Sequence, residues 1–143
     1  MKALSIVSHS EAETFALAKR LSTSFADGEV IVLTGPLGGG KTVFVRGLAA
    51  GRKIAEAAVS SPSFGFVNEY PGVSPIYHFD LYRLRDLSEL SEIGWDDYLQ
   101  RPGLIVIEWG EKAAEYLPTR YYLVQFAIID TDQREIQISQ VSS

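Results

Sequence analysis

The segment Gly35-Pro36-Leu37-Gly38-Gly39-Gly40-Lys41-Thr42 constrains this chain more than any other feature. It matches the pattern G-x-x-x-x-G-K-[ST] in full. An apolar run over residues 29–34 precedes it, and a stretch of helical character over residues 41–50 follows it. A strand, a glycine-rich loop and a helix in this order point backbone N–H groups and the positive end of a helix at one place. The segment therefore predicts an α/β fold with a phosphate-binding loop.

Each residue type in this loop suits nucleotide binding. Glycines let the backbone curl so that successive N–H groups face a phosphate. Lys41 supplies a cation for the β- and γ-phosphates, and Thr42 offers a hydroxyl to Mg²⁺. We therefore expect the whole loop, from Gly35 to Thr42, to bind ATP as substrate with Mg²⁺ as cofactor. The alternative is a glycine turn beside an ordinary surface lysine.

Composition narrows the class of protein. At 143 residues the chain has the size of a single domain, residues 1–143. Its 18 acidic and 13 basic residues give a net charge of −5, which disfavours wrapping nucleic acid unaided. The absence of cysteine excludes disulfides and thiolate chemistry, and two histidines are too few for a multi-histidine metal site. No apolar run approaches the length of a membrane span or a signal peptide, so we expect a cytoplasmic protein that does not bind membranes.

Periodicity and capping patterns predict the remaining elements. We expect helices over residues 11–24 and 111–116, and a helical stretch from Asp86 that is interrupted at Gly94. We expect strands over residues 76–81 and 104–109, loop and strand over residues 60–70, and a hairpin formed by residues 121–129 and 135–141. Together these elements predict a P-loop NTPase-like α/β fold, with a mixed, largely parallel sheet flanked by helices and a C-terminal β-hairpin.

Two carboxylates follow apolar runs and are candidates to complete the site. Glu108 ends one predicted central strand, where it could hold Mg²⁺ together with Thr42. Asp80 ends another, in which Ile76, His78 and Asp80 share one face. The alternatives are an exposed strand-end carboxylate for Glu108 and a turn cap for Asp80. His78 is interpreted as a structural residue, and Trp109 fits the core as well as the site.

Other nucleotide-binding classes are less well supported. The chain has neither an Asn/Thr-Lys-x-Asp segment for reading guanine nor an Asp-x-x-Gly switch, which favours ATP over GTP. A small-molecule kinase would need an arginine-rich lid, to which only Arg83-Leu84-Arg85 is comparable. A third class is a nucleotide-gated binding module with little hydrolysis. Phosphate release separates this module from an ATPase.

The glycine-rich loop is one of several segments that together resemble a known family. The others are Ser61-Pro62-Ser63-Phe64, His78-Phe79-Asp80-Leu81-Tyr82-Arg83-Leu84 and Ile107-Glu108-Trp109. In order and spacing they resemble the bacterial tRNA threonylcarbamoyladenosine biosynthesis ATPase family TsaE, also called YjeE. The similarity runs from about Ser8 to Trp109, with a weaker tail through Arg134.

This resemblance implies a function, partners and site residues. It implies a small ATPase that works with the partner proteins TsaB and TsaD, which install threonylcarbamoyl on an adenosine of tRNA, so that tRNA is contacted only indirectly. By position it implies that Lys41 and Thr42 bind phosphate and Mg²⁺, that Glu108 helps to hold the metal, and that Asp80 organises the attacking water. Residues 61–64 would form a switch-like segment. Residues bordering the nucleotide would include Ser10 and Arg134.

The chain departs from the family's pattern at three positions. Pro36 stands where Asp is frequent, Gly39 where Ala is frequent, and Ser63 where Thr is frequent. Pro36 removes a carboxylate and a backbone N–H, but it precedes the part of the loop that wraps the β-phosphate. Ser63 keeps the hydroxyl. We therefore expect nucleotide binding to be retained.

Overall fold

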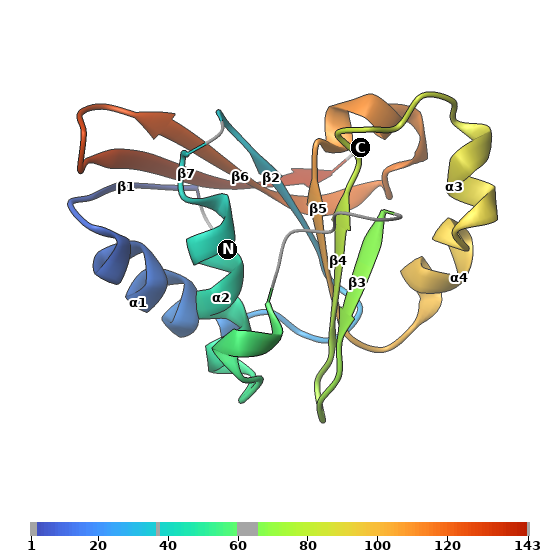
Figure 1. The fold of residues 1–143 in the computed structure, drawn as a ribbon, viewed down its shortest axis with the longest axis horizontal. Coiled ribbons are helices and arrows are strands. Elements are labelled where there is room, and N and C mark those ends of the chain that lie inside the picture. Colours follow the sequence, from blue (N-terminus) through green and yellow to red (C-terminus); the bar gives the residue numbers. More distant parts are fainter. Residues whose placement is uncertain (1–2, 37, 60–65, 143) are drawn as a thin grey trace.

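One mixed sheet organises the computed structural model, which describes residues 3–36, 38–59 and 66–142 (Figure 1). Within that part of the chain seven strands lie in the order β1-β7-β6-β2-β5-β4-β3. Strands β6, β2, β5 and β4 are parallel, and β1, β7 and β3 pair antiparallel at the two sides. The strands are β1 Leu4–Ser8, β2 Val30–Thr34, β3 Val67–Tyr70, β4 Ile76–Asp80, β5 Leu104–Glu108, β6 Arg120–Ile128 and β7 Arg134–Ser142.

Helices cover both faces of this sheet, because the buried strands are apolar on both sides (Figure 1). Ile31 and Leu33 of β2 pack in one core with α1 Glu11–Ser22 and α2 Lys41–Gly51. Val30 and Val32 face the opposite core, which includes residues of α3 Ser88–Glu92, α4 Trp95–Gln100 and the 3₁₀ segment η2 Gly110–Tyr116. A short 3₁₀ turn, η1 Glu56–Ala58, follows α2. Strand β2 is therefore buried on both faces, which holds the loop after it in place.

The close packing of α1 on α2 depends on Gly47. A Cβ atom at this position would lie 2.5 Å from the Phe15 carbonyl oxygen and 2.6 Å from the Ala18 Cβ. Real Cβ atoms do not approach other atoms so closely, so only glycine allows this distance between the helices. The contact sets the position of α2, the helix that follows the glycine-rich loop.

The predicted fold class is confirmed, with differences at element ends. The capping pattern that opens α1 is present: Ser10 Oγ accepts a hydrogen bond from the Glu13 N–H at 3.1 Å, and Glu13 accepts one from the His9 N–H at 3.2 Å. Helix α1 ends at Ser22 instead of residue 24, and Trp109 lies just outside β5. Strand β1 was not predicted, since its partner is β7, at the other end of the chain. No helix in the described ranges is long and apolar enough to cross a membrane.

Candidate functional site

The glycine-rich loop joins the end of β2 to the start of α2. Gly35 has φ 142°, and a Cβ atom there would lie 2.7 Å from the Phe126 carbonyl oxygen, so the loop needs glycine to lie against β6. The Gly39 N–H donates to the Pro36 carbonyl at 3.0 Å. The N-cap residue of α2, Gly40, makes no side-chain cap hydrogen bond, and the first N–H groups of such a helix suit an anion. Leu37 lies outside the described residues.

Lys41, the first residue of α2, is buried, with 7 % of its surface exposed. Its ammonium group donates to the Gly35 carbonyl at 2.9 Å, lies 4.0 Å from Glu108 Oε1, and sits 4.8 Å above the ring of Trp109. A buried cation needs such compensation. The loop lysine and the carboxylate at the end of β5 are thus held together beside the loop.

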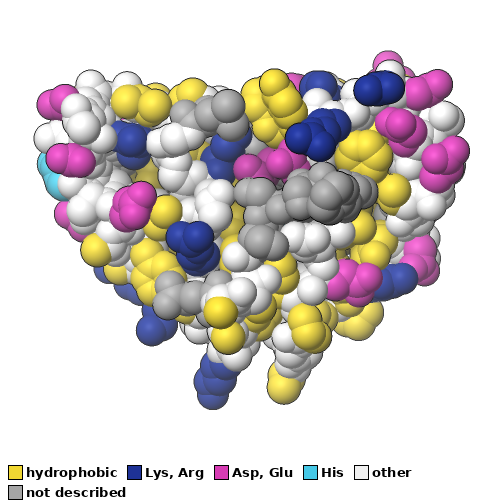
Figure 2. Space-filling model, viewed as in Figure 1, with side chains coloured by type: hydrophobic (Ala, Val, Ile, Leu, Met, Phe, Trp, Pro, Cys, Tyr) yellow, Lys and Arg dark blue, Asp and Glu magenta, His cyan; other side chains and the backbone are white. Residues whose placement is uncertain are grey.

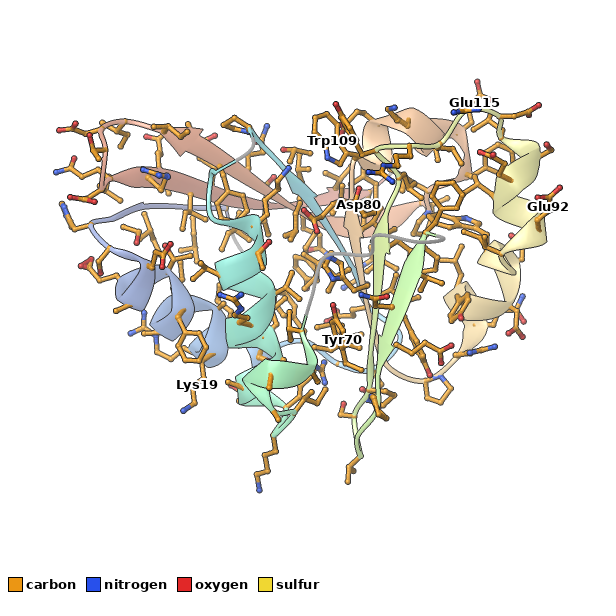
Figure 3. All side chains as sticks on the ribbon, in the orientation of Figure 1. Lys19, Tyr70, Asp80, Glu92, Trp109 and Glu115 are labelled. Carbon is orange, nitrogen blue, oxygen red and sulfur yellow. The ribbon has the colours of Figure 1, made fainter. Side chains whose placement is uncertain are left out.

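Sheet register brings the two candidate carboxylates to one edge. Asp80 of β4 pairs with Glu108 of β5, and Glu108 pairs with Leu33 of β2, so the carboxyl ends of three parallel strands meet beside the loop. Figure 3 shows Asp80 and Trp109 at this edge. A pocket of about 310 Å³ opens there. Its lining includes Lys41, Thr42, Asp80, Glu108 and Trp109, together with Glu11, Gly38, Gly40, Val43 and Arg46.

Asp80 is half-buried in this pocket. Burial raises the pKa of its carboxyl group above the ordinary value, and the nearby charge of Glu108 adds to that effect. The Tyr82 N–H, which donates to Asp80 Oδ1 at 3.0 Å, opposes the shift, as do His78 and Lys41. The turn-cap hydrogen bond considered as an alternative is therefore present, and Asp80 faces the pocket as well.

Glu108 is buried to 5 % exposure, so the alternative of an exposed strand-end carboxylate is wrong. Its Oε2 atom lies 2.5 Å from Nε2 of His78, which is itself fully buried. The other ring nitrogen of His78 lies 2.8 Å from the Tyr70 hydroxyl. Sequence reasoning left this contact out, although the two-residue period of β4 places His78 on the same face as Asp80.

Trp109 leaves β5 with φ 61°, a left-handed conformation that bulky residues rarely adopt. Its half-buried ring packs against the core and also covers Lys41. It also contacts the exposed ring of Tyr82, with 4.9 Å between the ring centroids. Trp109 therefore belongs to both the core and the pocket wall.

Ser10 and Arg134 line a smaller pocket of about 170 Å³, which shares Glu11, Gly38, Gly40 and Val43 with the pocket described above. The guanidinium group of Arg134 donates to the Gly38 carbonyl at 3.2 and 3.1 Å, and to three carbonyls of the β6–β7 turn. Ser10 caps α1. The structure thus brings both residues next to the loop, where each also has a structural partner. Ser61-Pro62-Ser63-Phe64 lies outside the described residues.

The donor set of the larger pocket suits a hard cation. Thr42 and Glu108 contribute a hydroxyl and a carboxylate, and oxygen ligands of this kind are preferred by Mg²⁺. Within the described ranges no group of three or more His, Asp or Glu side chains could hold a metal. A nucleotide-bound Mg²⁺ does not need such a group, because phosphates and water supply most of its ligands.

A glycine-rich loop between a central parallel strand and a helix, with carboxylates at the ends of two neighbouring strands, defines a P-loop NTPase-like α/β protein. The family model described as "Threonylcarbamoyl adenosine biosynthesis protein TsaE" matches residues 8–136. The chain belongs to the TsaE family, as its motifs led us to expect.

Individual relatives agree with this assignment. A Bacillus subtilis protein named "tRNA threonylcarbamoyladenosine biosynthesis protein TsaE" is 38% identical over 132 residues, covering 92% of this chain and 82% of the relative. A Treponema pallidum protein of the same name is 36% identical, covering 93% of this chain and 98% of the relative. The crystal structure of Bacillus subtilis YdiB superposes with a TM-score of 0.80 at 31% identity, covering 99% of this chain and 87% of that one.

Proposed function

We propose that this protein binds and hydrolyses ATP with Mg²⁺, in support of the threonylcarbamoyladenosine modification of tRNA. The observation that carries the proposal is the placement of Lys41 against Glu108, at 4.0 Å, in a pocket between the glycine-rich loop and the strand ends. The link to this modification is supported by the relatives, whose names refer to tRNA threonylcarbamoyladenosine biosynthesis.

The nucleotide-binding residues follow from this pocket. The N-terminus of α2 and the loop N–H groups would hold the phosphates, with Lys41 as their cation. Thr42 and Glu108 would hold Mg²⁺, which neutralises the charge that develops on the phosphates. The smaller pocket beside Ser10 and Arg134 would border the rest of the nucleotide.

Asp80 would orient the attacking water and accept its proton. A carboxylate is a better proton acceptor when its pKa is raised toward the working pH, and burial raises the pKa of Asp80. The side chain also lies in the same pocket as Lys41 and Glu108. Lys41, Asp80 and Glu108 are therefore the proposed catalytic residues.

We expect the partners to be TsaD-like and TsaB-like proteins, and contact with tRNA to be indirect. The net charge of −5 supports this expectation. Figure 2 shows Asp and Glu side chains over the side of the molecule formed by α3 and α4, with Lys and Arg side chains among them, and further Asp and Glu side chains at the opposite side. The net negative charge of the chain opposes the approach of a phosphate backbone.

Phosphate release tests the proposal directly. The purified chain is assayed with ATP and Mg²⁺, alone and with the candidate partners plus tRNA, beside Lys41→Ala as the inactive variant and the exposed Lys53→Ala as the control. Release that depends on Lys41 and increases in the mixture supports the proposal. Assembly that depends on bound ATP without phosphate release would instead indicate the nucleotide-gated module. A chain that binds no ATP would overturn both.

A further inference from the structure

A buried row of polar side chains runs behind the proposed metal ligand. Glu108 Oε2 lies 2.5 Å from His78 Nε2, and His78 Nδ1 lies 2.8 Å from the Tyr70 hydroxyl. The three residues are 5 %, 0 % and 2 % exposed. Figure 3 shows Tyr70 and Asp80 toward opposite ends of β4, the strand that carries His78 between them.

We propose that His78 is a positioning residue for the proposed ATPase reaction, which orients the carboxylate of Glu108 through this hydrogen bond. The inference rests on the proposed function, because it assigns Glu108 to Mg²⁺. His78 holds Oε2 on the core side of the carboxylate, and Oε1 is left facing Lys41 at 4.0 Å. His78 itself is absent from the lining of the pocket, so it acts through Glu108.

His78 can have this role because the terminal torsion of a glutamate side chain rotates easily. The terminal torsion of Glu is broad and roughly two-fold, so packing around the methylene groups does not determine the plane in which the carboxylate lies. A short hydrogen bond to one oxygen does determine it. Partners that orient metal-binding side chains in this way typically change metal affinity by about 10- to 100-fold when they are removed.

The hydrogen-bond donors can be assigned along the row. A carboxylate only accepts, so His78 Nε2–H donates to Glu108. In the neutral ring Nδ1 then accepts from the Tyr70 hydroxyl. Tyr70 thereby holds the imidazole in the tautomer that Glu108 needs.

A purely structural role does not account for a histidine here. His78 pairs with Val106 across the sheet and shares its face with Ile76, and both neighbours are fully buried and apolar. A buried imidazole is costly unless both nitrogens find partners, and here the partners are Glu108 and Tyr70. The specific gain from histidine is the donor that it presents to Glu108.

The first test reads the tautomer directly and needs neither metal nor nucleotide. The chain has two histidines, and the exposed His9 serves as the internal reference in an ¹⁵N NMR spectrum of the imidazole nitrogens. We expect His78 to carry its proton on Nε2, with an Nε2–H resonance that exchanges slowly and shifts in Glu108→Gln. Tyr70→Phe should weaken the preference for this tautomer. A proton on Nδ1 alone would overturn the proposal.

The second test compares two variants by the Mg²⁺ concentration needed for half-maximal ATP binding. His78→Leu removes the donor, and we expect that concentration to rise about tenfold. His78→Gln can place an amide N–H near the position of Nε2, and it should restore most of the loss. Binding measured without Mg²⁺ should be equal in all variants, and His9→Leu is the control.

The outcomes separate this inference from the proposed function. Should His78→Leu fail to fold, Tyr70→Phe keeps His78 and still gives both its tautomer and the Mg²⁺ dependence. Wild-type Mg²⁺ dependence in His78→Leu would refute the positioning role and leave the ATPase proposal standing. A wild-type chain that binds no ATP would refute the ATPase proposal. The tautomer measurement would still show whether His78 Nε2–H donates to Glu108.

Discussion

Replacing Glu108 by glutamine tests the centre of the site with almost no change in shape. The carboxylate lies between two donors, His78 Nε2 at 2.5 Å and the Lys41 ammonium at 4.0 Å. An amide has one accepting and one donating end. When its oxygen faces His78, its NH₂ group faces the ammonium of Lys41, and the opposite orientation places NH₂ against the Nε2–H of His78. With His78 in the Nε2–H tautomer, neither orientation satisfies both neighbours.

The size of the effect follows from burial. A hydrogen bond to a charged group contributes about 1.5–3 kcal/mol, and leaving a buried charge unpaired costs more. Lys41 keeps its hydrogen bond to the Gly35 carbonyl, which limits the loss. We therefore expect Glu108→Gln to lower the free energy of unfolding by about 2–3 kcal/mol. The Mg²⁺ concentration for half-maximal ATP binding should rise at least tenfold, about 1.4 kcal/mol.

Two measurements check this expectation, with the exposed Glu111→Gln as the matched control. Urea denaturation followed by circular dichroism gives the free energy of unfolding, and calorimetric titration with ATP at several Mg²⁺ concentrations gives the metal dependence. Glu111→Gln should match the wild type in both. If Glu108→Gln did so too, both the buried charge pair and the metal role of Glu108 would be refuted.

Lys41→Ala removes the cation of the loop, so ATP affinity or the rate of hydrolysis should fall at least tenfold, about 1.4 kcal/mol. Calorimetric titration and phosphate release measure the two quantities, and wild-type values in both would contradict the phosphate-binding role of Lys41. Asp80→Asn should slow hydrolysis while ADP binding stays near wild type, because positioning of the water matters in the transition state. Because burial raises the pKa of Asp80 above 3.8, its contribution to stability is present below the unfolded pKa and is lost as pH rises through the folded pKa. At pH 7, Asp80→Asn should therefore unfold at a urea concentration no lower than that of the wild type, and a less stable Asn variant would contradict this expectation. The pH at which wild-type hydrolysis falls off on the acid side should lie above 3.8. Gly47→Ala would place a Cβ 2.5 Å from the Phe15 carbonyl oxygen, and urea denaturation should show a loss of about 1–3 kcal/mol, which an unchanged midpoint would disprove.

Local sequence was enough to predict the glycine-rich loop and most of the elements. The residues from Gly35 to Thr42 are contiguous, and their pattern, together with the apolar run before them, specifies a strand, a loop and a helix without reference to the rest of the chain. Asp80 and Glu108 were predicted for a related reason. Each ends an apolar strand, and parallel strands deliver their last side chains to one edge of a sheet.

Contacts between distant residues were decided only by the tertiary structure. The pairing of β1 with β7 and the hydrogen bond from Arg134 to Gly38 join parts of the chain that no local pattern connects. The same holds for His78 and Glu108, which are 30 residues apart and meet because β4 pairs with β5 in a particular register. Periodicity reports which face of a strand a residue occupies, whereas the partner on that face depends on strand order and register, which long-range packing selects.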